Sequence, residues 1–356
     1  MKRGIFMAFI NKKKHYKALF LICLVMLFFL IILSSTLGVA DISIKQAVYI
    51  LLSKVPVVRN FINLESIKPN HIIIIHNIRL PRILLSSLVG MGLSVSGVAF
   101  QGMFKNPMAD PYILGVSSGA ALGATIAIIL NFQSLFMGFN LVTTMAFIGA
   151  ISSVFIVYSI ARTGNKISTV TLLLAGVTLS FLISSIISII MIFNRQQVDK
   201  IVFWIMGSLS SASWKYVGTI LPFVILGYFV IYLFSKDLNV MLTGDDSARS
   251  LGIEVEKTKK IILFTTSLVV AASVSVSGVI GFVGLIIPHA IRILIGPDHR
   301  VLVPFSALGG AIFMIISDTL SRTLIPPNEI PVGAITSLFG APYFIYLLIK
   351  SKKQVK

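Results

Sequence analysis

The chain has 356 residues, of which 56% are hydrophobic and 12% are charged, and it carries a formal net charge of +18. Soluble domains carry about 25% charged residues, so this composition excludes a water-soluble core and predicts a polytopic membrane protein. The positive charge does not indicate a nucleic-acid partner, because the Lys and Arg residues lie in short segments between apolar runs. The single cysteine, Cys23, excludes a disulfide framework within the chain.

Ten apolar segments approach the ~20 residues that a helix needs to cross a bilayer. We predict that they are helices, because a chain in lipid must satisfy its own backbone hydrogen bonds. The first follows a basic start, but its length and the lack of a cleavage site predict a retained helix. Gly278, Gly281 and Gly284 mark an expected break between the seventh and eighth segments. The ten segments are residues 18–37, 83–102, 113–131, 141–161, 170–193, 217–234, 261–276, 280–295, 302–321 and 331–349.

The distribution of basic residues predicts the orientation of the chain. A two-to-one excess of the 30 Lys and Arg residues falls on the side that holds both termini, so both termini are expected to be cytoplasmic. The whole chain, 1–356, is expected to form one transmembrane domain. Within it we expect a cytoplasmic N-terminal segment at 1–17, an extracellular cap at 38–81 and a long cytoplasmic loop at 235–260. The isoleucine-rich part of the cap, between His71 and His76, is β-like in composition.

Small residues and an internal repeat indicate how the helices pack. Gly115, Gly119 and Gly123 recur at four-residue spacing, which predicts one helix face that a neighbour can approach closely. The pentapeptide SVSGV at 94–98 recurs at 275–279, and at the same offset Pro107 matches Pro288, and Gly115 matches Gly296. If the second span corresponds to the seventh, the repeat has an offset of five spans, and because five is odd the two halves are inverted, as in many transporters. Residues 198–207 are apolar but too short to span, which predicts a half-helix.

The cytoplasmic loop can form a compact projection. Asp245 or Asp246 can cap a short helix, Gly252 can end it in a left-handed conformation, and a second short helix can begin near Glu254. Two interpretations fit this pattern: a projection on which a partner protein docks, or a solvated segment that only connects the sixth and seventh spans. The segment from Gly252 to Thr258 lacks the second glycine of a phosphate-binding loop, so an ATPase would be a separate chain.

Few ionisable residues fall inside the spans. Asp318 can pair with Arg322 four residues later, and His289 lies near Arg292. A structural ion pair is the interpretation we favour, and an ion-coupled secondary transporter that uses Asp318 and His289 is the alternative. No nucleophile–base arrangement and no metal-ligand spacing are found, so neither catalysis nor a metal site is expected.

Seven segments together make the chain resemble the FecCD family, the permease subunits of iron–siderophore, haem and cobalamin ABC importers. The segments are RLPR at 79–82, QGMFKNPMADPYILGVSSGA at 101–120, LLLAGV at 172–177, GDDSARSLG at 244–252, GFVGLIIPHAIR at 281–292, DHR at 298–300 and LFGAPYFIYLL at 338–348. The resemblance implies an all-α type II ABC importer permease fold with ten transmembrane helices in two inverted five-helix halves. It implies transport of a ferric siderophore, or alternatively of haem or cobalamin, by a protein of the cell membrane that is not itself an enzyme and has no cofactor.

The resemblance also implies partners and site residues. The partners are two copies of an ABC ATPase subunit, an extracytoplasmic substrate-binding protein and a second permease subunit, as a homodimer or a heterodimer of paralogues, in the lipid bilayer. Docking of the binding protein falls on Arg79, Arg82 and Arg322, whose planar guanidinium groups suit carboxylates. Coupling to the ATPase falls on Asp245, Asp246, Ser247, Ala248, Arg249, Leu251 and Gly252. The translocation path and its gates fall on Ser168, Thr169, Val170, Gly207 and Ser208, and Val170 occupies a position that is often polar in the family.

Overall fold

The structure is a computed structural model that describes residues 2–53, 67–131, 135–136, 139–164 and 166–354. In these ranges the regular secondary structure is helical apart from two antiparallel pairs of two-residue strands, β1 with β2 (Leu135–Phe136, Phe139–Asn140) and β3 with β4 (Arg162–Thr163, Lys166–Ile167). The predicted all-α class is therefore confirmed. The longer helices are α1 (Lys2–Thr36), α5 (Leu80–Met103), α6 (Val116–Ile129), α7 (Leu141–Ala161), α8 (Thr169–Phe193), α10 (Trp214–Leu233), α13 (Val255–Ser277), α14 (Val283–Ile295), α15 (His299–Thr323) and α16 (Val332–Gln354). The shorter elements are α2 (Ile44–Leu52), α4 (Pro69–Ile73), the π-helical η1 (Ile74–Arg79), the 3₁₀-helical η2 (Pro111–Leu114) and η3 (Arg195–Gln197), α9 (Val198–Ile205), α11 (Ser235–Met241) and α12 (Asp245–Ser250).

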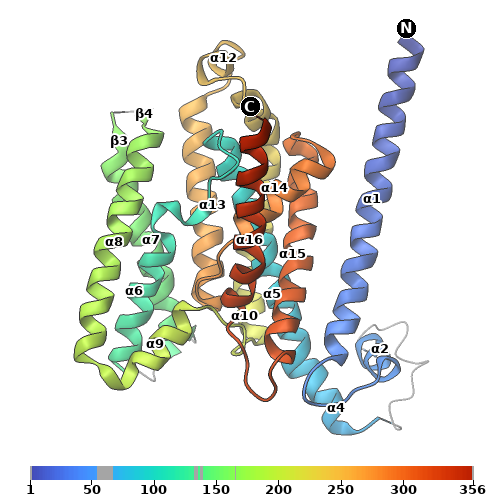
Figure 1. Cartoon of the computed structure of the whole chain (residues 1–356), viewed down its shortest axis with the longest axis vertical. Coiled ribbons are helices and arrows are strands. Elements are labelled where there is room, and N and C mark those ends of the chain that lie inside the picture. The colour runs from blue at the N-terminus through green and yellow to red at the C-terminus, as the bar shows by residue number, and fades with distance from the viewer. Residues whose placement is uncertain (1, 54–66, 132–134, 137–138, 165, 355–356) are drawn as a thin grey trace.

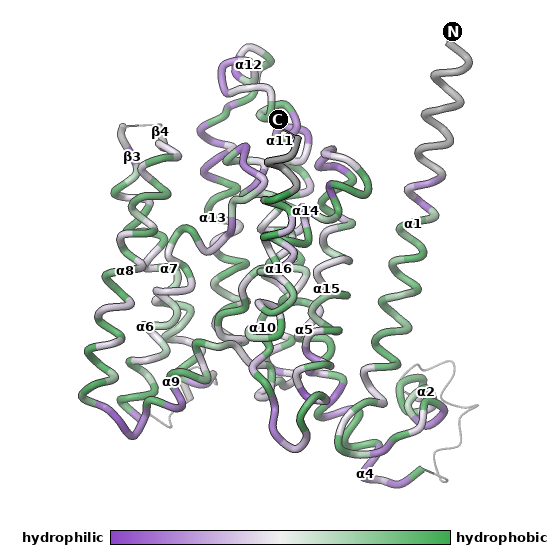
Figure 2. The backbone as a smooth tube through the Cα atoms, in the orientation of Figure 1, coloured by the Kyte–Doolittle hydropathy of each residue, from purple (hydrophilic) through white to green (hydrophobic). Residues whose placement is uncertain are grey.

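The ten predicted spans all correspond to helices. Seven helices among the described residues are long and apolar enough to cross a membrane, and α6, α14 and the first part of α16 are shorter apolar helices. Figure 2 shows hydrophobic residues along the middle of the bundle and hydrophilic residues at α12 and at several connections at the opposite end. The first helix extends beyond the predicted span, because α1 already begins at Lys2 and continues through the basic N-terminal segment.

The two ends of the bundle carry different elements (Figure 1). The start of α1, the end of α16 and the short helix α12 lie at one end, which we call the α12 end. The helices α2 and α4 lie at the other, which we call the α4 end. Both termini therefore lie at the same end, as an even number of spans requires.

Two sets of four helices have opposite orientations. The helix α5 runs from the α4 end to the α12 end, whereas α13 begins beside α12 and runs the other way (Figure 1). Each is followed by a break, at 104–115 and 278–282, and then by a short helix, α6 or α14. The sets α5–α8 and α13–α16 are therefore the cores of the two predicted inverted halves.

The sequence matches that suggested the repeat do not occupy equivalent positions. Residues 94–98 lie within α5, whereas 275–279 run across the end of α13. Pro107 lies between helices, whereas Pro288 lies inside α14. The break after α5 is longer than the break after α13. A single sequence offset therefore cannot align α5 with α13 and also align α6 with α14.

The central contact of the bundle joins α5 and α15 through two glycines. A Cβ built on Gly90 would lie 2.1 Å from the carbonyl oxygen of Gly310, and one built on Gly310 would lie 2.2 Å from that of Gly90. The two backbones therefore touch, which no larger residue would allow. A second contact between the halves is aromatic: Phe264 of α13 packs against Phe155 and Tyr158 of α7, with ring centroids 5.8 and 5.3 Å apart.

The predicted glycine face is confirmed for two of its three members. A Cβ on Gly119 or Gly123 of α6 would lie 2.3 or 2.0 Å from a backbone oxygen of α7, so these glycines allow α6 and α7 to pack closely. Gly115 does not share this face, because it precedes the helix and has a left-handed φ of 72°.

The β-like interpretation of the cap is wrong. Residues Pro69–Met103 form one continuous apolar helix, whose π-helical turn is η1. Ile75 packs into a small core with residues of α2, and this burial outweighs the β preference of the isoleucines. The carbonyl oxygen of His76 accepts from Trp214 Nε1 at 2.9 Å, and Pro81, five residues after His76, has no N–H to donate to it. The remainder of the expected cap, 54–66, lies outside the described residues.

Candidate functional site

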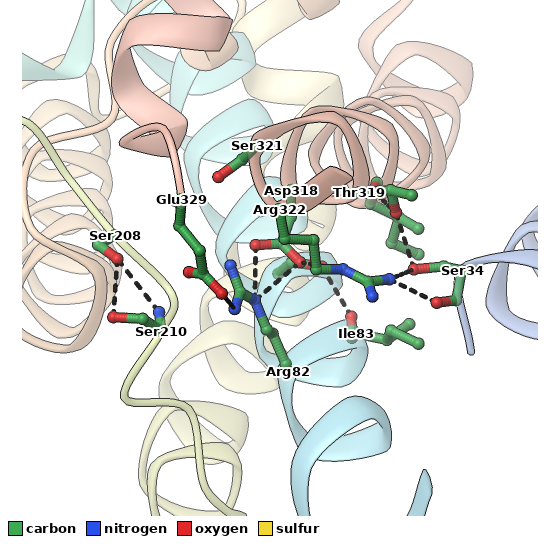
Figure 3. A network of polar contacts seen from close by, with 12 residues as sticks. Ser34, Arg82, Ile83, Ser208, Ser210, Asp318, Thr319, Ser321, Arg322 and Glu329 are labelled. Atoms are coloured by element: carbon green, nitrogen blue, oxygen red, sulfur yellow. Dashed lines mark hydrogen bonds and ion pairs between the residues drawn. The ribbon is translucent and has the colours of Figure 1, made fainter. Parts of the chain in front are cut away.

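A cluster of charged side chains lies at the α4 end, and we call Arg79, Arg82, Asp318, Arg322 and Glu329 the arginine cluster. Figure 3 labels Arg82, Asp318, Arg322 and Glu329. Arg82, in the first turn of α5, donates from Nε to the two carboxylate oxygens of Asp318 at 2.9 and 3.1 Å. It also donates from Nη1 to Glu329 Oε1 at 2.8 Å. The side chain of Asp318, on α15, is 1% exposed, while that of Glu329, between α15 and α16, is 40% exposed.

The other two arginines hold the end of α1. The last carbonyl groups of a helix lack partners and carry partial negative charge, so guanidinium groups stabilise them. Arg79 donates to the carbonyl oxygens of Ser35, Thr36 and Ala40 at 2.7, 2.9 and 2.7 Å. Arg322 donates to the carbonyl oxygens of Ser34 and Leu37, and to the Ser34 hydroxyl at 2.8 Å.

The three arginines predicted to dock the binding protein therefore come together in space, but they also have internal partners. Arg79 and Arg82 are buried. The predicted pair of Asp318 with Arg322 is present at 3.8 Å, yet Arg82 is the closer cation. The docking role remains a prediction, and the sequence did not anticipate that these side chains join α1, α5 and α15.

The cytoplasmic-loop prediction corresponds to α11, α12 and the start of α13, which together form a projection that we call the knob. After α12, Ile253 N donates to Ala248 O and Gly252 N donates to Arg249 O, both at 3.0 Å, which is the Schellman arrangement. Gly252 has a φ of 84°, so the predicted left-handed stop is confirmed.

Two details of the knob differ from expectation. Gly244 occupies the N-cap position of α12, and neither Asp245 nor Asp246 caps the helix with its side chain. No separate second short helix forms, because the helix that begins at Val255 continues as α13. The apolar run after residue 260 extends that helix into the bundle.

Asp245 has a bridging role in place of a capping role. Its Oδ1 accepts from Lys105 Nζ and its Oδ2 from Lys259 Nζ, both at 2.5 Å. Burial disfavours the charged carboxylate, but the hydrogen bonds from the two lysines outweigh this and hold the pKa of Asp245 below its ordinary value. Asp245 thus connects α12 to the segment after α5 and to α13.

The predicted coupling residues divide into exposed and buried members. Leu251 is 70% exposed and Ala248 is 0% exposed. Ala248 packs with Met241 and Val255 in the core of the knob, so it cannot itself contact a partner. Ser247 and Asp246 are exposed, and Arg249 is held by Asp246 at 2.8 Å and Glu256 at 3.3 Å.

Two further polar residues hold elements together: Asn239 holds the knob to α15, and Gln101 holds α5 to α14. Asn239 of α11 donates to Asp298 Oδ1 at 2.7 Å and accepts from His299 N at 2.9 Å, at the start of α15. Gln101 of α5 donates to Leu285 O at 3.1 Å and accepts from Arg292 Nη2 at 3.1 Å, both in α14. Gln101 and Arg292 lie within quoted motifs, but only the fold brings them together.

The predicted path residues lie at two places, at the start of α8 and just after the end of α9. Ser168 is the N-cap of α8 and accepts from Thr171 N at 3.3 Å, next to the partly buried Thr169 and the exposed Val170. Gly207 and Ser208 follow α9, which confirms the predicted half-helix. Gly207 has a φ of 75°, and a Cβ there would lie 2.5 Å from Val279 O. Ser208 N donates to Ser277 O at 2.8 Å, so the end of α9 rests on the break between α13 and α14.

A cavity of about 420–460 Å³ opens at each of two places near these elements. The one beside α9 has a volume of 460 Å³ and is lined by hydroxyl-bearing residues that include Ser210, Tyr216 and Ser277, together with Lys200. The one beside the knob has a volume of 420 Å³ and is lined by Arg249 and the first turn of α13. Among the described residues, no group of three or more His, Cys, Asp or Glu side chains could hold a metal ion.

Inverted, discontinuous helical halves with a braced knob at one end define a polytopic membrane transport protein. The model of the FecCD transport family matches residues 25–350, and the chain belongs to this family, as the sequence motifs predicted. The chain is 45% identical over 276 residues to the cobalamin import system permease protein of Halobacterium salinarum, covering 78% of this chain and 73% of the relative. It is 43% identical over 285 residues to the hemin transport system permease protein of Yersinia pestis, covering 78% and 84%.

A solved structure has a closely similar fold. It is an inward-facing metal-chelate type ABC transporter, which matches with a TM-score of 0.81 and 31% identity, over 94% of this chain and 99% of that chain. The predicted permease fold is therefore confirmed.

Proposed function

We propose that this chain is the permease subunit of an ATP-driven importer that carries a ferric siderophore across the cell membrane. Family membership supports import, and relatives include permeases named for iron(3+)-hydroxamate and Fe(3+)-citrate in Bacillus subtilis. The relatives named for hemin and cobalamin make haem and cobalamin the alternative substrates.

The α12 end faces the cytoplasm in this proposal, so both termini are cytoplasmic. The positive-inside rule supports this orientation, because the basic residues Lys105, Lys259 and Arg300 lie at or beside the knob. Two copies of a separate ATPase subunit bind there, with Leu251 and Asp246 as the exposed contact residues of each knob.

A second permease subunit covers the outward face of α8 in the assembled importer. This face is apolar and exposed in the single chain, and it includes Val170, Leu174, Phe181 and Phe193. A second copy of this chain would bury the face and place the two copies of Ser168–Val170 and of Gly207–Ser208 on a shared axis. These residues are the inner and outer gates of the path in the proposal.

The observation that carries the mechanism is the bracing of the knob. Asp245 ties it to α13 and the end of α5, and Asn239 ties it to α15. Closure of the ATPase pair would therefore move helices of both halves together, because each knob is fastened to them. Rigid-body rocking of the halves then opens the path alternately to each side. The binding protein delivers its substrate at the α4 end.

The test is transport by the reconstituted complex. Proteoliposomes that hold the permease and ATPase are given the binding protein loaded with radioactive ferric siderophore, and uptake is measured with ATP and with a proton ionophore. We expect uptake that requires ATP and the binding protein and is insensitive to the ionophore. Uptake without ATP that collapses with the ionophore would support an ion-coupled secondary transporter. ATP-driven uptake of hemin or cobalamin alone would change the substrate but not the class.

A further inference from the structure

We propose that Glu329 occupies, in the free permease, the place on Arg82 that a carboxylate of the binding protein takes when it docks. This inference rests on the proposed function, because the partner is the binding protein of that importer. Glu329 is then an internal stand-in for the partner's acid, and docking is an exchange of one carboxylate for another.

The two acids on Arg82 differ in how they are held. Asp318 accepts both of its hydrogen bonds from Nε and is enclosed between α5 and α15. Glu329 accepts from Nη1 on the other side of the guanidinium group, and Figure 3 shows it reaching toward Arg82 from outside α15. Residues 324–329 are all exposed, so Glu329 can leave Arg82 without disturbing the core. Glu329 is 40% exposed and Asp318 is 1% exposed, so water can solvate Glu329 when it leaves Arg82, while Asp318 keeps the buried arginine paired.

The charges of the cluster favour an acidic partner. It contains three arginines and two acids, a formal charge of +1, and the carbonyl groups that Arg79 and Arg322 contact add no full negative charge. The cluster is therefore positive even when Glu329 is bound, and it becomes more so when Glu329 leaves. An incoming carboxylate restores the balance and keeps Arg82 paired throughout, which avoids the cost of an unpaired buried charge.

The segment that carries Glu329 also leads to the outer gate residues. Its end is fixed by Ser321 and Ile330, where Ile330 N donates to Ser321 O at 3.0 Å and the Ser321 hydroxyl donates to Ile330 O. Three residues later, a Cβ on Gly333 of α16 would lie 2.3 Å from Met206 O, directly before Gly207. Exchange at Arg82 thus acts on a segment whose far end touches the chain at the end of α9.

The experiment measures the affinity of the permease–ATPase complex in nanodiscs for the binding protein that supports its uptake. Glu329→Gln keeps the size of the side chain but removes the competing charge, so we expect binding about three- to tenfold tighter at low salt. The matched control is Asp199→Asn, which removes an exposed acid from α9 at the same end. We expect the control to change affinity less than twofold. Unchanged or weaker binding by Glu329→Gln, or an equal gain in the control, would overturn the proposal.

A second comparison tests Arg82 itself. Arg82→Gln alone would leave Asp318 buried without a partner, so the background is Arg82→Gln with Asp318→Asn. In that background we expect Glu329→Gln to give no gain, and a gain of the original size would contradict the role of Arg82. Failure of the proposed function is separable, because no binding protein would then support ATP-driven uptake by the wild-type complex.

Discussion

Asp245 lies 2.5 Å from both Lys105 and Lys259, which belong to different segments of the bundle. A single carboxylate at the start of α12 therefore joins the knob to the two inverted halves. The first half contributes Lys105 and the second contributes Lys259, so a force on the knob reaches both.

Asp245→Asn is expected to loosen the knob. It removes two partly exposed ion pairs, which together contribute about 1 kcal/mol to its stability. The pKa of Asp245 is lower than its ordinary value of 3.8, so this stabilisation is present above that value and is lost as the pH falls through the lower, folded value. Hydrogen exchange of residues 245–252 should be faster in the variant at neutral pH. Equal exchange in the two proteins would contradict the bracing role, and Lys257→Met, which removes an exposed pair nearby, is the control.

Ala248→Glu is expected to unfold the knob locally. The methyl group lies in the small core with Met241 and Val255, and a buried unpaired charge costs about 3–5 kcal/mol. Amide protection of residues 245–252 should therefore be lost. Leu251→Glu changes an exposed residue of the same helix end and should leave this protection unchanged, so equal loss in both variants would contradict the observed packing.

Gly90→Ala is expected to destabilise the whole bundle. The new Cβ would lie 2.1 Å from the backbone oxygen of Gly310, so α5 and α15 would have to separate. We expect a clear drop in Tm of the detergent-solubilised protein. The matched control is Gly218→Ala in α10, where nothing lies within 4 Å of the added Cβ, and its Tm should not fall. A Tm for Gly90→Ala that matches the control would exclude the close contact.

Replacing Arg79 and Arg322 together by Met is expected to release the end of α1. Their hydrogen bonds hold the carbonyl groups from Ser34 to Ala40, and little of α1 is otherwise buried. A spin label at the exposed residue Val39 should become more mobile in the variant. Arg195→Met, at an exposed arginine of the same end, should not affect the label. A label of unchanged mobility in the double variant would show that other contacts hold α1.

The helices and their breaks could be predicted from sequence because hydropathy, length and glycine are local signals. The spans, the half-helix α9, the break after Ser277 and the left-handed Gly252 all depend on such signals. The β-like interpretation of residues 71–76 failed, because burial of Ile75 and continuity with α5 outweigh the local preference of isoleucine.

The partners of the site residues could not be predicted, because they depend on packing between distant segments. Arg82 and Asp318 are 236 residues apart in sequence. The burial of Ala248 was also out of reach, since α12 has only six residues and shows no periodicity that would separate its inner from its outer face. The family motifs assigned Arg82 to docking and Ala248 to coupling, but they do not show that both side chains are buried.

The most direct test of ATP coupling through the knob is uptake by the complex with Leu251→Glu. Leu251 is exposed at the end of α12, so the change leaves the fold intact and alters only the proposed contact with the ATPase. Leu251→Met is the conservative control, and Leu294→Glu makes the same change at another exposed leucine. We expect ATP-driven uptake to fall at least tenfold in Leu251→Glu while the protein remains folded in the membrane and both controls retain uptake. Uptake at the wild-type rate in Leu251→Glu would contradict coupling through the knob.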